Sequence, residues 1–95
     1  MDVANEPYTD IARAYVVEYF NEHVEKTDKA RSGFEMTKEH TFVVLSSYIL
    51  GNWKVLVSTT VPDGMYYEVT HNETKGETYL DAYKKFNNVC YYELP

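Results

Sequence analysis

The strongest constraint on the fold is a change in the spacing of apolar residues near Gly33. From Thr9 to about Arg31 the apolar side chains recur every three or four positions, as on one face of a helix. Beyond Gly33 they come in shorter runs that are separated by turn residues. The sequence therefore predicts one long helix followed by several strands.

The predicted helix is amphipathic. Thr9 with Asp10 is the expected N-terminal cap, Pro7 precedes it, and Gly33 is the expected stop. The polar face carries Arg13, Glu18, Glu22 and Glu25. The apolar face, which must pack on another element, is formed by Ile11, Ala12, Tyr15, Val16, Tyr19 and Phe20.

Four turn signals divide the rest of the chain into strand-length pieces. They lie at 51–52, 62–64, 75–76 and 87–88, and consist of Gly, Pro, Asn, Asp and Lys. Five consecutive strands are expected from this spacing, and the short connections favour antiparallel neighbours.

Alternation indicates which strand residues face the core. Trp53, Val55 and Val57 share one face, and so do Met65, Tyr67 and Val69, while Tyr66 points the other way. Leu80, Ala82 and Phe86 share a face of the next strand, and Tyr91 and Tyr92 fall on opposite faces of the expected last one.

Residues 40–50 are ambiguous, because their apolar side chains occupy both alternating positions. They fit a doubly buried strand or a second short helix, and their Val, Phe, Tyr and Thr content favours the strand. We expect a single α+β domain over residues 1–95, in which residues 1–8 form a flexible N-terminal segment. One long helix packs on a curved antiparallel meander of four to five strands.

The charge balance favours some partners over others. The formal net charge is -6, which disfavours a nucleic-acid partner because such binding depends on Lys and Arg neutralising phosphates. A neutral or basic protein partner is compatible with it. No apolar run approaches the length of a membrane span, so no membrane association is expected.

The N-terminal stretch lacks the basic and apolar regions of a signal peptide. We therefore expect a cytoplasmic protein if the sequence is complete, and a secreted one if a signal segment has been removed. Cys90 is the only cysteine, which rules out an intrachain disulfide and is compatible with a reducing compartment.

Three stretches together resemble the cystatin family of cysteine-protease inhibitors. "IARAYVVEYFN" (11–21) is similar to the helix signature of plant cystatins, "TVPDG" (60–64) stands at the place of the inhibitory loop, and "YYEVTHNETKGETYLDAYKKF" (66–86) follows it as the family's long strands do. Thr60 and Pro62 occupy positions where the family has Gln and Val, and Gly64 matches. The resemblance implies a cystatin-like fold and a protein-binding hairpin formed by Val61, Pro62, Asp63 and Gly64.

The same hairpin is also an ordinary turn, since Pro-Asp-Gly favours a turn without any binding role. A helix wrapped by a curved sheet resembles the NTF2-like folds as well, which hold small molecules between sheet and helix. Under that alternative the pocket residues would be Tyr15, Tyr19, His71, Asp81 and Tyr83.

No sequence motif indicates catalysis, a metal site or a cofactor. We expect a non-enzymatic protein-binding module, with inhibition of an enzyme such as a cysteine protease as the finer hypothesis. The alternatives are the pocket protein and a small acidic immunity or anti-enzyme protein that blocks a basic partner. Homodimerisation through an edge strand or a sheet face is a further expectation.

Overall fold

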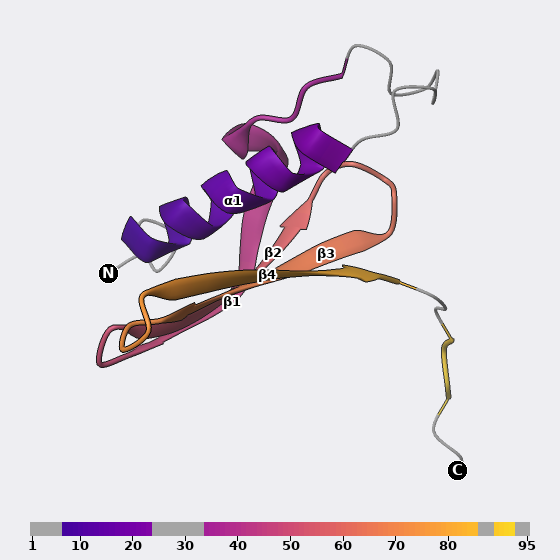
Figure 1. The fold of residues 1–95 in the computed structure, drawn as a ribbon. Coiled ribbons are helices and arrows are strands. Elements are labelled where there is room, and N and C mark those ends of the chain that lie inside the picture. The colour runs from indigo at the N-terminus through magenta and orange to yellow at the C-terminus, as the bar shows by residue number, and fades with distance from the viewer. Residues whose placement is uncertain (1–6, 24–33, 86–88, 93–95) are drawn as a thin grey trace.

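The structure is a computed structural model that describes residues 7–23, 34–85 and 89–92. It contains helix α1 (Pro7–His23), a short 3-10 helix η2 (Lys38–His40) and strands β1 (Thr41–Ile49), β2 (Asn52–Thr59), β3 (Met65–Asn72) and β4 (Glu77–Lys84). The strands form one antiparallel sheet in the order β1-β2-β3-β4, and α1 lies across one face of it (Figure 1). The α+β class is thus confirmed, and the four strands fall within the expected four to five. Neither described helix has the length and apolar character needed to cross a membrane.

The first turn of α1 begins earlier than the sequence indicated. Pro7 is the first helical residue, where its fixed φ suits a helix and its missing N–H is not needed. Thr9 lies inside the helix with a buried side chain, so the prediction that it forms the N-terminal cap was wrong. Residues 7 and 8 likewise belong to the helix and not to a flexible segment. The expected stop at Gly33 lies outside the described residues.

The core forms between α1 and one face of the sheet, which we call the inner face. Every third or fourth residue of α1 is buried: Thr9, Ala12, Val16 and Phe20. Ala12 and Val16 belong to the core with the sheet, while the Phe20 ring packs edge-on against Phe34. The sheet contributes Trp53, Val55 and Val57 from β2, and Tyr67 and Val69 from β3. The alternation predicted for β2 and β3 is therefore confirmed.

The buried stripe of α1 is narrower than the predicted apolar face. Ile11 and Tyr15 are exposed, and Tyr19 is half-buried at the edge of the core, with its ring edge-on to Tyr67. A single helix packed on a sheet face buries only the helical residues along the line of closest approach. The flanking apolar side chains remain at the surface for this reason.

This geometry predicts unequal costs for two aromatic truncations in α1. Phe20→Ala removes a ring that is 5% exposed and should lower the free energy of unfolding by about 3–5 kcal/mol. Tyr15→Ala removes a ring that is 42% exposed and should cost no more than about 1 kcal/mol. Urea denaturation of both variants measures the difference, and equal losses would contradict the packing of α1.

A tight two-residue turn and a bulge shape the first hairpin. Leu50 and Gly51 join β1 to β2 with φ values of 51° and 85°, so both central residues of the turn are left-handed, as in a type I′ hairpin turn. Farther along, the pairing register shifts between Val43 and Leu45. Val44 is the extra residue, and it moves Leu45 onto the face opposite Val43. The bulge explains why the apolar residues of 40–50 occupy both alternating positions, and it settles the stretch as a strand.

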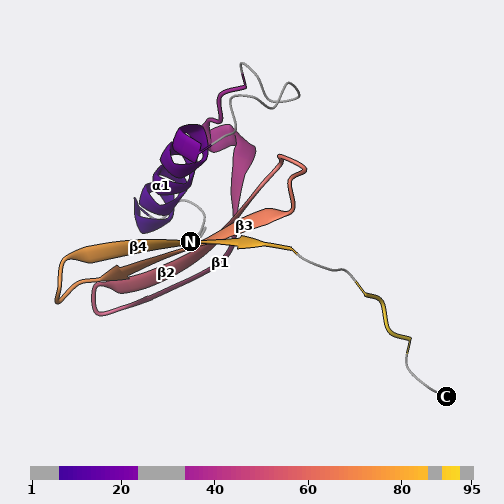
Figure 2. The same cartoon turned by 45° about the vertical axis from the view of Figure 1, so that its right-hand side comes forward.

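The expected fifth strand is not present in the described residues. Val89 to Tyr92 pair with no strand and extend away from the sheet (Figures 1 and 2). The sheet edges are therefore β1 and β4. The turn expected at 87–88 and the inward position of Phe86 lie outside the described residues.

Two polar side chains of α1 hold the segment that leads into β1. Asn21 pairs with the backbone of buried Met36 in both directions: its Nδ2 donates to the carbonyl at 3.0 Å, and its Oδ1 accepts from the N–H at 2.8 Å. Arg13 Nε donates to Thr41 Oγ1 at 2.8 Å, and its Nη2 donates to the Lys38 carbonyl at 2.7 Å. Arg13, which the sequence placed on the solvent face, thus joins α1 to the start of β1.

Loss of the Asn21 amide should leave two backbone groups of a buried residue without partners. Asn21→Ala should therefore cost about 1–3 kcal/mol of unfolding free energy. Glu22→Ala, at the adjacent exposed position, is the control and should change it by no more than about 0.5 kcal/mol. Chemical denaturation measures both. An Asn21→Ala variant as stable as the control would show that the two Asn21–Met36 hydrogen bonds do not contribute to stability.

Candidate functional site

The sheet face that points away from α1, which we call the outer face, carries an unusual number of apolar side chains. The register places Phe42 and Leu45 of β1, Leu56 of β2 and Tyr66 of β3 on it. Leu45 is 66% exposed. No described element lies over this face in either ribbon view (Figures 1 and 2). Exposed apolar side chains gathered on one surface are typical of an interaction site.

A groove of about 540 Å³ runs along one end of the outer face. Its floor comes from the sheet, and its wall comes from the loop that joins β2 to β3. It is lined by Val44, Leu56, Ser58, Thr59, Val61, Gly64, Met65, Tyr66 and Lys85. Two of the four predicted hairpin residues, Val61 and Gly64, thus border the groove.

The hairpin Val61–Gly64 is held by backbone and side-chain hydrogen bonds. Val61 N–H donates to Thr59 Oγ1 at 3.2 Å, Asp63 N–H donates to the Val61 carbonyl at 2.9 Å, and Met65 N–H donates to Asp63 Oδ1 at 3.0 Å. Lys85 N–H donates to the Gly64 carbonyl at 2.6 Å, which ties the loop to the end of β4. Pro62 is exposed at the surface. The loop is consequently exposed and at the same time fixed in shape.

Gly64 and Pro62 should respond differently to substitution by alanine. Gly64 has φ of +73°, and a Cβ there would meet only ordinary contacts with Lys85, so Gly64→Ala should cost about 1 kcal/mol through backbone strain. Pro62→Ala should change stability by no more than about 1 kcal/mol, because the ring is exposed. Thermal or urea unfolding of the two variants makes the comparison. A large loss for Pro62→Ala would mean that the proline ring maintains the fold.

The five residues proposed for an internal pocket do not come together. Tyr15 is exposed on α1, and Tyr19 stacks on His23 at a centroid distance of 4.1 Å. Asp81 and Tyr83 face outward, because they pair with Glu68 and Tyr66. His71, in contrast, faces inward beside Trp53. The sheet therefore lies between Asp81 and Tyr83 on its outer side and the other three residues on its helix side.

His71 forms a polar contact network at one end of the inner face. Its ring stacks on Trp53 at 5.3 Å, its Nδ1 lies 2.8 Å from Thr78 Oγ1, and its Nε2 lies 3.1 Å from Glu73 Oε2. Glu73 N–H donates to Asn52 Oδ1, so the network joins the β1–β2 and β3–β4 turns. One ring nitrogen has a partner in β4 and the other in the β3–β4 turn, and this arrangement suits a structural histidine.

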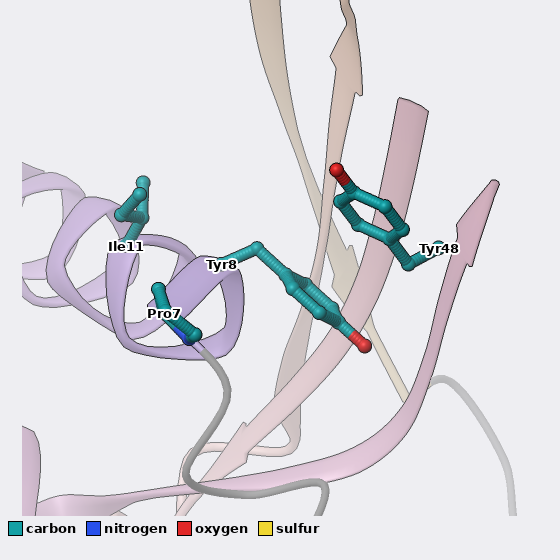
Figure 3. Close-up of a pocket in the computed structure, with 4 residues that line it drawn as sticks. All are labelled: Pro7, Tyr8, Ile11 and Tyr48. Carbon is teal, nitrogen blue, oxygen red and sulfur yellow. The ribbon is translucent and has the colours of Figure 1, made fainter. Parts of the chain in front are cut away.

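A second cavity, of about 450 Å³, lies between the start of α1 and the end of β1. Figure 3 shows Tyr8 reaching from α1 toward the strands, with Tyr48 beside it and Pro7 and Ile11 on the helix. The Tyr8 and Tyr48 rings are 5.2 Å apart. The described residues of the lining offer apolar surface and two phenols, and they include no carboxylate, imidazole or thiol. This surface suits an apolar group.

Metal ligands do not gather anywhere in the part of the chain that the structure describes. The polar groups that matter chemically are instead carboxylates on the outer face. Glu68 of β3 and Asp81 of β4 are direct neighbours in the register. Glu68, followed by burial, Asp81 and Tyr66, raises the pKa of Tyr83 above its usual value.

Sequence reasoning missed the apolar half of the outer face. In sequence, Leu56 lies between Val55 and Val57, whose side chains point to the inner face. Regular alternation from Val43 would also have pointed Leu45 toward the helix. Only the bulge at Val44 brings Leu45 next to Leu56. The signal in the sequence was the run of apolar residues on both alternating positions of 40–50.

A protein-family model described as a family of unknown function (DUF6275) matches residues 9–93, which is most of the chain. No curated protein and no solved structure matches the chain.

Proposed function

The chain belongs to this family of unknown function, whose description assigns no activity, and we propose from its geometry that it is a protein-binding module. The outer face of the sheet, with the adjoining β2–β3 hairpin, is the binding surface. The observation that supports this most is the open groove between exposed apolar side chains and a loop of fixed shape.

Two physical reasons favour a protein partner over a small molecule. The groove is open, and the exposed residues Phe42 and Leu45 pair with two of its lining residues, so apolar surface continues beside it. Aromatic and aliphatic side chains at the centre of a surface supply most of the binding energy in protein interfaces. A loop held by its own hydrogen bonds also loses little entropy when it binds.

A cystatin-like inhibitor is the finer form of this proposal. The helix followed by an antiparallel meander is compatible with that architecture, and the exposed, hydrogen-bonded hairpin supports an inhibitory loop. In this form Val61 and Pro62 contact the cleft of a protease, and Gly64 permits close approach of the backbone. If the protein is instead an acidic protein that blocks a basic partner, the contacts are made by the carboxylates of the outer face.

The binding surface can be tested with short random peptides displayed on phage and selected on the wild-type protein. Selected peptides should lose affinity by at least about tenfold on Leu45→Asp, because a carboxylate then occupies the centre of the outer face. Leu50→Asp is the matched control: Leu50 is more exposed, and it lies in the β1–β2 turn away from the groove. Peptides that bind both variants equally, or a selection that yields none, would contradict the proposal.

The inhibitory form has a separate test in a cysteine-protease activity assay. Inhibition by the wild type that is lost in Val61→Asp with Pro62→Asp would support it. If the wild type does not inhibit, the hairpin is not an inhibitory loop, while the outer face still stands as a binding surface.

A further inference from the structure

The outer face is chemically divided. The half formed by β1 and β2 carries the apolar side chains of Phe42, Leu45 and Leu56 beside Lys54 and several small polar residues, whereas the half formed by β3 and β4 combines carboxylates with tyrosine rings. This second half holds Glu68, Glu77, Asp81, Tyr66, Tyr79 and Tyr83. The division indicates what kind of partner suits the surface, and the inference below rests on the proposed protein-binding function.

The charges of the β3–β4 half are not balanced within the sheet. Glu68 and Asp81 face each other directly, an arrangement that is unfavourable for like charges on neighbouring strands. Among the outward-facing strand residues the opposing charge is Lys54, whose Nζ lies 3.9 Å from Glu68 Oε2, and Lys85, the residue after β4, lines the groove. Such a long, partly exposed pair contributes little. The opposed carboxylates of Glu68 and Asp81 therefore attract cations.

Aromatic rings lie next to these carboxylates. Tyr66 and Tyr83 stack at a centroid distance of 5.1 Å with an interplanar angle of 16°, and they are 38% and 41% exposed. The negative field of Glu68 and Asp81 reaches this pair, because it raises the pKa of Tyr83. An exposed ring face near a carboxylate attracts a cation through both the ring quadrupole and the full charge.

The apolar groove and the acidic half are continuous. Tyr66 belongs to both: it lines the groove together with Leu56, and it stacks on Tyr83 on the other side. A partner segment that crosses the outer face therefore meets an apolar hollow and then, within one strand spacing, a cation-attracting surface.

We propose that the partner is a basic protein segment in which an arginine seats on the Tyr66–Tyr83 stack beside the carboxylates of Glu68 and Asp81, while a neighbouring apolar side chain fills the groove. Arginine fits better than lysine, because its planar guanidinium stacks on aromatic rings and binds carboxylates through two hydrogen bonds. A nucleic acid is excluded as occupant of this face, since its phosphates would meet the carboxylates. A second copy of the chain is disfavoured as occupant, because it carries the same acidic face and a net charge of -6.

A labelled peptide of alternating arginine and leucine is a suitable probe, and its citrulline counterpart keeps the shape without the charge. Fluorescence anisotropy near physiological salt should show at least about tenfold weaker binding of the citrulline peptide to the wild type. Glu68→Gln with Asp81→Asn should weaken the arginine peptide by a similar factor. These changes relieve a like-charge opposition, so the variant should fold.

The control removes the same two charges elsewhere. Glu18→Gln with Glu22→Gln alters exposed carboxylates of α1 and should leave the affinity unchanged. Equal losses in both double variants would mean that only net charge matters, and would overturn the inference. If the two peptides bind equally and both lose affinity on Leu45→Asp, the cation preference fails and the binding surface survives. If Leu45→Asp binds as the wild type does, both proposals fail.

Discussion

The packing of one helical stripe on one sheet face is the interaction on which the rest of the structure depends. Ala12 and Val16 meet the inner face of β2 and β3, and this contact is the main source of buried apolar surface in the described chain. One helix covers one face only, and a sheet of four strands has two. The outer face is consequently not covered by any described element, so its side chains are available for binding.

Two features of the outer face do not contribute to the core between α1 and the sheet. The bulge at Val44 adds Leu45 to the outer face beside Leu56, although the inner face is already filled by Val43, Val55 and Val57. On β3 and β4, opposed carboxylates persist where a solvated sheet would favour pairs of opposite charge. Residues that fit a local rule poorly often belong to functional surfaces. The hairpin beside them, fixed by Asp63 and by its bond to Lys85, adds a rigid rim.

Much of the fold could be predicted, because strong periodicity reports burial directly. The alternation of Trp53, Val55 and Val57 fixed the inner face of β2, and the helical spacing identified α1. The errors have physical causes. Tyr15 and Thr9 were misplaced because helical spacing does not tell how wide a stripe the sheet covers or where the first turn begins. Tyr91 and Tyr92 were predicted in a last strand, but residues with strand propensity form a strand only where a neighbouring strand pairs with them. Leu45 was not predicted on the outer face because a bulge, which simple alternation does not predict, sets its direction.

The central claim is that the outer face is open in the isolated protein and available to a partner. Solvent paramagnetic relaxation of methyl protons, measured by NMR with a soluble gadolinium chelate, tests it most directly. The account predicts strong enhancement for the methyl groups of Val44 and Leu45 and almost none for those of Val55 and Val69. Enhancements at Leu45 as small as those at Val55 would show that the face is already covered, and would contradict the account.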